Sequence, residues 1–431
     1  MNRDAEEDLP EDVQNNVARN GLRQVAGQAL QSSGDQIVNP STVLPWLFAV
    51  LGVPPALTGA LVPIRESGSM LPQALLTPLV LRAKRRTRVF TAGALIQAAS
   101  VAAIAATAAL AEGTFAGLLI LAALAVFSLG RCLCSIASKD VQGRTIPKGE
   151  RGQINGLATT ASGIVAITLG LGIRVYGGED LSAGSLAWML VGGALLWVGV
   201  AVVYAGIREP VETDTQPTPP ERSDESDAGW FGTMVALLRE DAPFRTFVLV
   251  RSLLLVSALS PPFIVAMSID AGASALAGLG SFIIASGIAA LIGGRIFGSQ
   301  ADRSSKRLMS VGAALASATI ILTVVIVSLP GFSGDTWAGT LVFVASYFLL
   351  RLTHTGVRVA RKTYVVDMAE GDQRTIYTAV SNSAMGLILL IVGAVSSAIA
   401  AIHVSWALLF LAAMGLLGVV AGRRLPDVSR G

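Results

Sequence analysis

Residues 185–206 read SLAWMLVGGALLWVGVAVVYAG, a run of 22 positions without a charged side chain. An α-helix needs about 20 consecutive apolar residues to cross the hydrocarbon core of a bilayer. A stretch of this length and composition therefore predicts a transmembrane helix that ends near residue 206.

Similar apolar runs lie on both sides of this segment. The whole chain is 52% hydrophobic and only 14% charged, whereas soluble domains carry about 25% charged residues. A water-soluble fold could not cover so much apolar sequence with polar surface. We therefore predict an all-α membrane protein with twelve transmembrane helices, at 42–63, 68–82, 89–110, 114–137, 153–175, 185–206, 245–268, 275–299, 308–329, 338–358, 376–401 and 404–422.

Polar segments divide these helices into two bundles. The longest connection, 207–244, is rich in Pro, Thr, Ser, Asp and Glu in its middle, which predicts a flexible linker. Its last part, 229–240, is expected to form a short helix at the membrane surface. The predicted organisation is an N-terminal tail (1–40), a six-helix bundle (41–206), the linker (207–244), a second six-helix bundle (245–422) and a C-terminal tail (423–431).

Basic residues are distributed unevenly between the two sides that these helices define. If the N-terminus lies in the cytoplasm, 23 Lys and Arg residues fall in the inner connections and C-terminal tail. Only two, Arg65 and Arg174, fall in the outer connections. Because cytoplasmic connections carry an excess of Lys and Arg, both termini are predicted to be cytoplasmic.

The sequence also argues against several classes of function. No basic, aromatic-interleaved patch lies outside the membrane flanks, so no nucleic-acid partner is expected. Cys132 and Cys134 lie two positions apart on a predicted helix and point to different faces, so we expect packing rather than a metal site or a disulfide. No zinc-protease, nucleophile or phosphate-loop motif is present, so we expect neither an enzyme nor a cofactor.

Two connecting segments carry a resemblance to a known family. Residues 298–307 read GSQADRSSKR and are similar to the pattern G-x-x-x-D-R-x-G-R-K, with matches at Gly298, Asp302, Arg303, Lys306 and Arg307. Residues 147–156 read PKGERGQING and are similar to P-x-x-x-R-G-x-x-x-G, with matches at Pro147, Arg151, Gly152 and Gly156. With the predicted helices and linker, these motifs make residues 41–422 resemble the major facilitator superfamily.

The chain also departs from the family pattern. Ser305 replaces the second glycine of the first motif, and the corresponding segment 82–88, RAKRRTR, lacks both the acidic residue and the glycine. The two predicted six-helix bundles also show a weak internal sequence repeat. Arg131 and Arg351 lie at corresponding positions of the predicted fourth and tenth helices. The resemblance implies transport by alternating access, with these matched segments serving as cytoplasmic gate elements.

Four arginines lie at membrane depth, inside predicted spans: Arg131, Arg251, Arg295 and Arg351. An ionisable side chain costs about 2.5–3.5 kcal/mol there and should face a cavity or a partner. They either form a basic cavity for an anionic solute or pair with neighbouring helices and extend to the interface.

One face of the predicted tenth helix carries a polar stripe. Its members follow spacings of 4, 3, 4 and 3, which places them on one side of a helix: Tyr347, Arg351, His354, Arg358 and Arg361. On the fourth helix, Arg131 and Ser135 begin a similar face. Such a stripe predicts either a solute path or a cytoplasmic gate, and His354 either titrates near neutral pH or simply packs.

Carboxylates that could couple transport to protons are few. Glu66 follows Arg65 in the short predicted connection between the first two helices, and partial burial would favour proton uptake. The alternative is a simple Arg65–Glu66 pair. Asp270, at the outer end of the seventh helix, is either a coupling residue or a loop charge.

The leading hypothesis is a secondary transporter for a small organic solute, anionic or zwitterionic, driven by protons or by exchange. Membrane lipids are its expected surroundings, and the resemblance implies an inner (plasma) membrane of bacterial type. The alternatives are a drug-type proton antiporter and a non-transporting sensor or assembly partner with the same fold. The sequence assigns no protein partner.

Overall fold

A computed structural model describes residues 14–73, 76, 80, 83–146, 164–165, 167–168, 170–171, 182–209, 230–273, 275–368 and 373–426. All regular elements within these ranges are helices. They are α3 (Val17–Ile37), α4 (Val43–Val50), α5 (Pro55–Thr58), α6 (Leu61–Met70), α8 (Arg86–Leu110), α9 (Gly113–Thr145), α11 (Ala183–Ala205), α12 (Trp230–Glu240), α13 (Ala242–Leu253), α14 (Val256–Leu259), α15 (Pro261–Asp270), α16 (Ala275–Val327), α17 (Trp337–Met368), α18 (Gln373–Ala400) and α19 (Val404–Gly422).

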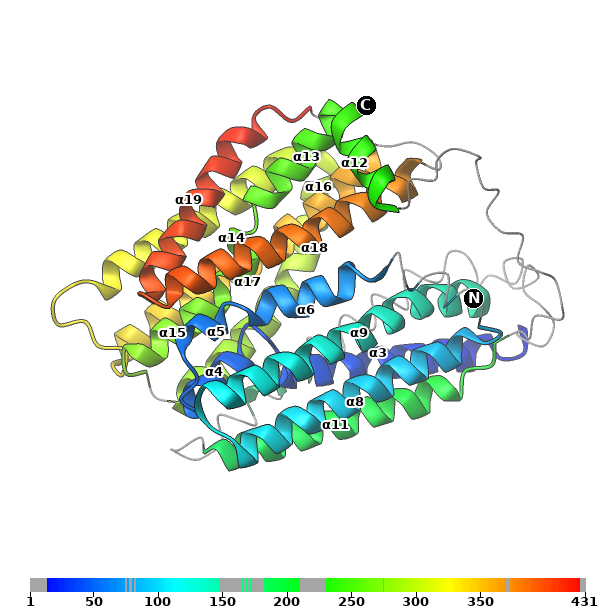
Figure 1. The fold of residues 1–431 in the computed structure, drawn as a ribbon, viewed down its shortest axis with the longest axis horizontal. Helices are drawn as coiled ribbons and strands as arrows, with labels where there is room; N and C mark the ends of the chain where they lie inside the picture. Colours follow the sequence, from blue (N-terminus) through cyan, green and yellow to red (C-terminus); the bar gives the residue numbers. More distant parts are fainter. Residues whose placement is uncertain are drawn as a thin grey trace.

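The helices form two groups that follow one another along the chain (Figure 1). In the first group, α8 packs against α9 and α11, and α11 also packs against α3. In the second group, α16 packs along α17 and α19, and α13 and α18 both contact α19. α16 is two helices joined at Ser304, whose backbone is extended.

Eight of the described helical segments are long and apolar enough to cross a membrane. They are Arg86–Leu110, Gly113–Gln142, Ala183–Ala205, Ala242–Asp270, Arg303–Val327, Trp337–Arg361, Val380–Ala400 and Val404–Gly422. Large apolar side chains such as Trp188, Leu195 and Val202 are exposed on the outside of these segments, where hydrocarbon would cover them. The chain is therefore an integral membrane protein, and the count of twelve spans stays a prediction.

The prediction of a tail over residues 1–40 is wrong for residues 14–40. Helix α3 packs against α11 and contacts α9, and its Asn20, Gln24 and Ser33 side chains are buried. Asn20 exchanges hydrogen bonds with the backbone of Arg208, and Gln24 donates to Thr145 Oγ1 at 2.8 Å. Polar side chains that find partners inside the protein can enter a helical bundle without an apolar sequence.

The first predicted span, 42–63, is also wrong, because the chain turns within it. Helix α4 ends at Val50, and Gly52 takes a left-handed conformation, with φ +67°, before α5 begins at Pro55. The turn is held by a hydrogen bond of 2.7 Å from the Gly113 N–H to the Leu51 carbonyl. As a consequence, Arg65 and Glu66 lie inside helix α6 rather than in a connection between helices.

Helices α8 and α9 approach closely at a pair of glycines. A Cβ atom added to Gly93 would lie 2.7 Å from the Gly130 carbonyl oxygen, and one added to Gly130 would lie 2.7 Å from the Gly93 oxygen. Small residues at such positions let transmembrane helices pack backbone to backbone. Cys134 lies in the same contact, where its Sγ is buried beside Gln97, as expected for a packing residue.

Replacing Gly93 with alanine is expected to lower the stability of the protein. The added methyl group meets backbone atoms that cannot move without separating α8 from α9, and such overpacking costs about 1–3 kcal/mol. Gly192→Ala is the matched control, because its Cβ would meet nothing within 4 Å. Thermal unfolding in detergent should show a lower Tm for Gly93→Ala only, and equal Tm values for the two variants would contradict this packing.

Candidate functional site

A cavity of about 410 Å³ lies between the two groups of helices. The first group lines it with residues from α3 and α6 and with Arg131 of α9. The second group lines it with four residues of α17 and with residues of α14, α16 and α18. Its charged lining among the described residues consists of two carboxylates and five arginines: Asp35, Glu66, Arg65, Arg131, Arg351, Arg358 and Arg361. The cavity is therefore polar and carries a formal excess of three positive charges.

Asp35 forms ion pairs with two arginines of the first group. Its Oδ1 accepts a hydrogen bond of 2.9 Å from Arg65 Nη2, and its Oδ2 lies 2.7 Å from Arg131 Nη1. These contacts connect α3, α6 and α9 at one point. One carboxylate thus contacts two guanidinium groups.

Arg65 is held in a rigid position. Its side chain is only 10% exposed, and its guanidinium carbon lies 4.9 Å from the centre of the Phe127 ring. An aromatic face attracts a cation electrostatically, so Phe127 helps to keep Arg65 inside the protein. Asp35 and Arg131 retain more exposure, 21% and 26%, and present polar atoms to the cavity.

The second group contributes four residues of the stripe predicted on the tenth helix. Arg351, His354, Arg358 and Arg361 all line the cavity from α17. The Nδ1 atom of His354 is buried and has no hydrogen-bond partner among the described residues. Arg358 is solvent-exposed within the cavity. Since no carboxylate of the second group is among the described lining residues, this face is strongly basic.

Glu66 is the carboxylate that interacts with this face from the other group. It lies on α6, lines the cavity and attracts both Arg358 and Arg361 electrostatically. The interaction therefore crosses between the two groups of helices.

The two groups touch beyond one end of this cavity. Helix α4 contacts α15, and α5 contacts α18 and α15, at the side of the molecule opposite to α12 (Figure 1). The Thr42 and Tyr347 hydroxyl groups lie 2.5 Å apart and are buried, and Ser67 Oγ donates to the Gly386 carbonyl at 2.7 Å. Tyr347 therefore joins the two groups and is not part of the cavity lining.

Replacing Tyr347 with phenylalanine is expected to weaken this closed end. The change removes a hydrogen bond that contributes about 1 kcal/mol, which should shift the population of open forms by roughly fivefold. Spin labels at Leu110 and Ile402, which are 86% and 83% exposed, would report the separation of the groups. Tyr364→Phe is the control, because Tyr364 donates to Pro426 within the second group. Unchanged distances in Tyr347→Phe would show that this contact does not hold the end closed.

The structure brings most of the predicted solute and coupling residues together, with four exceptions. Arg251 donates to Ser381 and Asn382 of α18, at 2.8 and 3.1 Å, so it connects α13 to α18 away from the cavity. Asp270 ends α15 and does not line the cavity. Ser135 does not line the cavity, and neither does Tyr347. The inter-helix alternative holds for Arg251.

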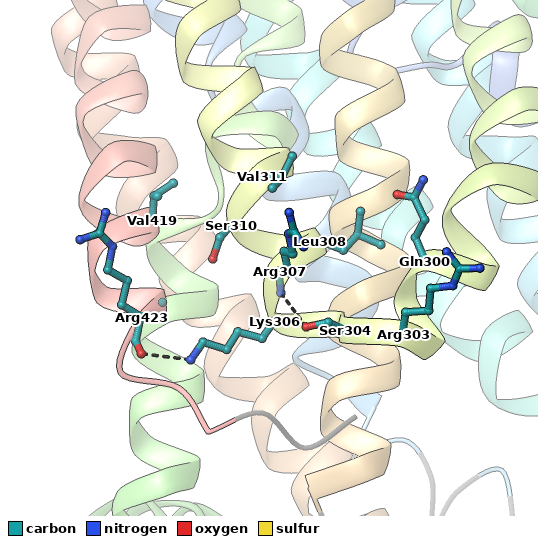
Figure 2. A pocket seen from close by; sticks show the side chains of 11 residues that line it. Gln300, Arg303, Ser304, Lys306, Arg307, Leu308, Ser310, Val311, Val419 and Arg423 are labelled. Atoms are coloured by element: carbon teal, nitrogen blue, oxygen red, sulfur yellow. Dashed lines mark hydrogen bonds between the residues drawn. The ribbon is translucent and has the colours of Figure 1, made fainter. Parts of the chain in front are cut away.

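The two motif segments lie elsewhere. Arg303, Lys306 and Arg307 surround a second pocket at the break in α16 (Figure 2). Gly298 and Asp302 belong to the first part of α16. The residues of the other motif, Pro147, Arg151, Gly152 and Gly156, lie outside the described residues, so their predicted place in a gate stays untested.

Sequence reasoning missed Asp35, which is the centre of the charge cluster. The available signal was a polar stripe at helical spacing through the supposed tail, formed by Asn20, Gln24, Gln28, Gln31 and Asp35. Four of these side chains line the cavity or are buried: Gln28 and Asp35 line it, and Asn20 and Gln24 are buried against the backbone of Arg208 and against α9. A second signal was that the predicted span 68–82 is too short to cross a bilayer. Its shortness indicated that the helices in this part of the chain were wrongly assigned.

Comparisons with known proteins support the fold. No protein-family model and no curated protein matches the sequence. The structure is similar to that of a D-xylose-proton symporter, with a TM-score of 0.71, 12% identity, and coverage of 95% of this chain and 98% of the other. It is also similar to the nucleoside transporter NupG, with a TM-score of 0.68, 14% identity, and 94% and 99% coverage.

A bacterial homologue of the iron transporter ferroportin, solved in an inward-facing state, gives a TM-score of 0.64 at 14% identity, with 96% and 99% coverage. These similarities extend over nearly the whole length of each chain, from the first group of helices to the last. The resemblance inferred from the motifs is thus confirmed at the level of structure: this chain has the fold of the major facilitator superfamily transporters.

Proposed function

We propose that this protein is a secondary transporter that moves a small organic anion across the membrane by alternating access. The observation that carries the proposal is the cavity between the two groups of helices, with its five arginines and two carboxylates. Ligand sites commonly lie at the interface of two halves and combine concave shape with a few converging polar groups. The fold shared with solved transporters supports the same assignment.

The charge of the lining favours an anion. Asp35 is already occupied by Arg65 and Arg131. The remaining carboxylate among the described lining residues is Glu66, whose charge acts on Arg358, Arg361 and Arg65. A ligand with carboxylate or phosphate oxygens could accept charge-assisted hydrogen bonds from the α17 guanidinium groups. A drug-type antiporter for cations, the alternative considered from the sequence, would meet mostly repulsion here.

The cavity also suggests how a ligand would drive the conformational change. Arg351, Arg358 and Arg361 come from the second group, whereas Gln28, Asn39 and Ser41 come from the first. A ligand that contacts both sets stabilises the form in which the groups approach each other, and a ligand can shift an equilibrium only through such differential contacts. We expect the termini to be cytoplasmic and the cavity to open on that side in the present conformation.

Glu66 offers a route to coupling. When the anion is absent, Glu66 balances Arg358 and Arg361 across the cavity; when it is present, the two negative charges compete. Protonation of Glu66 would relieve this competition, so proton uptake and anion binding would favour each other. In an exchange mechanism, one anion would replace another on Arg358 and Arg361, and no proton would be needed. In both mechanisms Glu66 is the carboxylate that competes with the anion for these arginines.

Uptake into proteoliposomes tests the proposal. The panel should contain citrate, malate and 3-phosphoglycerate as anions, choline and ethidium as cations, and xylose as a neutral solute. We expect time-dependent uptake or exchange of at least one anion and none of the cations. Uptake of cations alone would contradict the anionic assignment, while ligand binding without any flux would favour the sensor that retains the fold.

A further inference from the structure

A second, more superficial pocket lies at the junction of α16 and α19. Its volume is about 770 Å³, and it is open on one side to the surroundings. Four basic residues line it: Arg303, Lys306, Arg307 and Arg423. They come from both sides of the break at Ser304 and from the end of α19 (Figure 2). No carboxylate is among the lining side chains that the structure describes.

The pocket lies where two apolar spans end. The span Arg303–Val327 begins in it, and the span Val404–Gly422 ends in it. Leu308, Val311 and Val419 line its inner part, and Val311 is 54% exposed. An open site with cations at one level and exposed apolar side chains one to two turns deeper has the polarity profile of the membrane interface.

The geometry of the pocket is fixed by hydrogen bonds between and within the elements that form it. Lys306 Nζ donates to the backbone carbonyls of Arg423 and Leu425, which fixes the end of α19 against α16 (Figure 2). Ser304 Oγ accepts from the Arg307 N–H at 3.3 Å and begins the second part of α16. The guanidinium groups of Arg303, Arg307 and Arg423 have no recorded partner among the described residues, so they are available to a ligand.

We propose that this pocket binds the headgroup of an anionic phospholipid. The phosphate oxygens would accept hydrogen bonds from the three available arginines, which suit phosphate because the guanidinium is planar and donates two parallel bonds. The acyl chains would lie along Val311 and Val419 toward the hydrocarbon. The site is separate from the central cavity, shares no lining residue with it, and does not depend on the proposed transport function.

The test is native mass spectrometry of the purified full-length protein with phosphatidylglycerol and phosphatidylcholine of identical acyl chains. Wild type should retain phosphatidylglycerol in preference to phosphatidylcholine. The triple variant Arg303→Gln, Arg307→Gln, Arg423→Gln should lose this preference, because each basic residue contributes about fivefold near a lipid surface, or on the order of a hundredfold for three. The single variant Arg307→Gln should lose about fivefold, and it keeps the test valid if the triple variant does not fold.

The matched control removes three basic residues that are also exposed and lie just before and at the start of α8, in the variant Lys84→Gln, Arg85→Gln, Arg88→Gln. It should keep the preference for phosphatidylglycerol. Equal losses in both triple variants would overturn the proposal, because they would show diffuse attraction to the charged surface. Displacement of the lipid by millimolar inorganic phosphate would overturn it as well, since the ligand would then be a soluble phosphate.

Discussion

Asp35→Asn is expected to lower the stability of the protein and to abolish most of its transport. The substitution removes the carboxylate that faces Arg65 and Arg131 and leaves two cations close together. Loss of one partner from a buried ion pair costs about 3–5 kcal/mol. Because Asp35 is 21% exposed and Arg131 is 26% exposed, solvent screens part of this repulsion, and we expect a loss of about 2 kcal/mol.

The control for this prediction is Asp335→Asn, which makes the same chemical change in an exposed turn between α16 and α17. Thermal unfolding in detergent should show a lower Tm for Asp35→Asn and an unchanged Tm for the control. The double variant Asp35→Asn, Arg131→Gln should recover part of the loss, because it removes one of the unpaired cations. A fully additive double variant would contradict the pairing of these two residues.

Arg351→Ala is expected to reduce transport by roughly ten- to a hundredfold while leaving expression close to that of wild type. A hydrogen bond between charged groups contributes about 1.5–3 kcal/mol, and its loss from the ligand corresponds to that change in affinity. Arg351 lines the cavity from α17, and no ion pair to a described carboxylate is recorded for it, so its removal should not disturb the fold.

Arg88→Ala provides the comparison, because Arg88 is exposed at the start of α8 and does not line the cavity. Initial rates of anion uptake should fall in Arg351→Ala and stay unchanged in Arg88→Ala, at equal amounts of reconstituted protein. Wild-type rates in Arg351→Ala would remove the basic face of α17 from the solute path.

The features that the sequence predicted best are those governed by lipid contact and helical period. Apolar runs such as 185–206 correspond to observed helices because hydrocarbon admits few polar side chains. The spacing from Arg351 to Arg361 correctly placed these residues on one face of α17. Both inferences need only the local sequence. The membrane fixes the length and composition of a spanning helix, and the helical period fixes which side chains share a face.

The errors occurred where the surroundings of a helix are protein rather than lipid. Helix α3 is too polar for a hydropathy-based prediction, yet Asn20 and Gln24 are paired inside the bundle. Depth in the membrane likewise does not tell which neighbour an arginine faces: Arg131 reaches the cavity, while Arg251 reaches Ser381. These distinctions depend on how the helices pack, which a single sequence does not specify.

The most direct test of an anion site between the two halves is a thermal-shift measurement on purified wild type and Arg351→Ala side by side. Because a ligand that binds the folded state raises its apparent stability, citrate, malate or 3-phosphoglycerate should raise the Tm of wild type by several degrees, and choline should not. The same anion should shift Arg351→Ala much less. Stabilisation by choline alone, or an equal shift of both proteins by the anion, would contradict a ligand held by the arginines of α17.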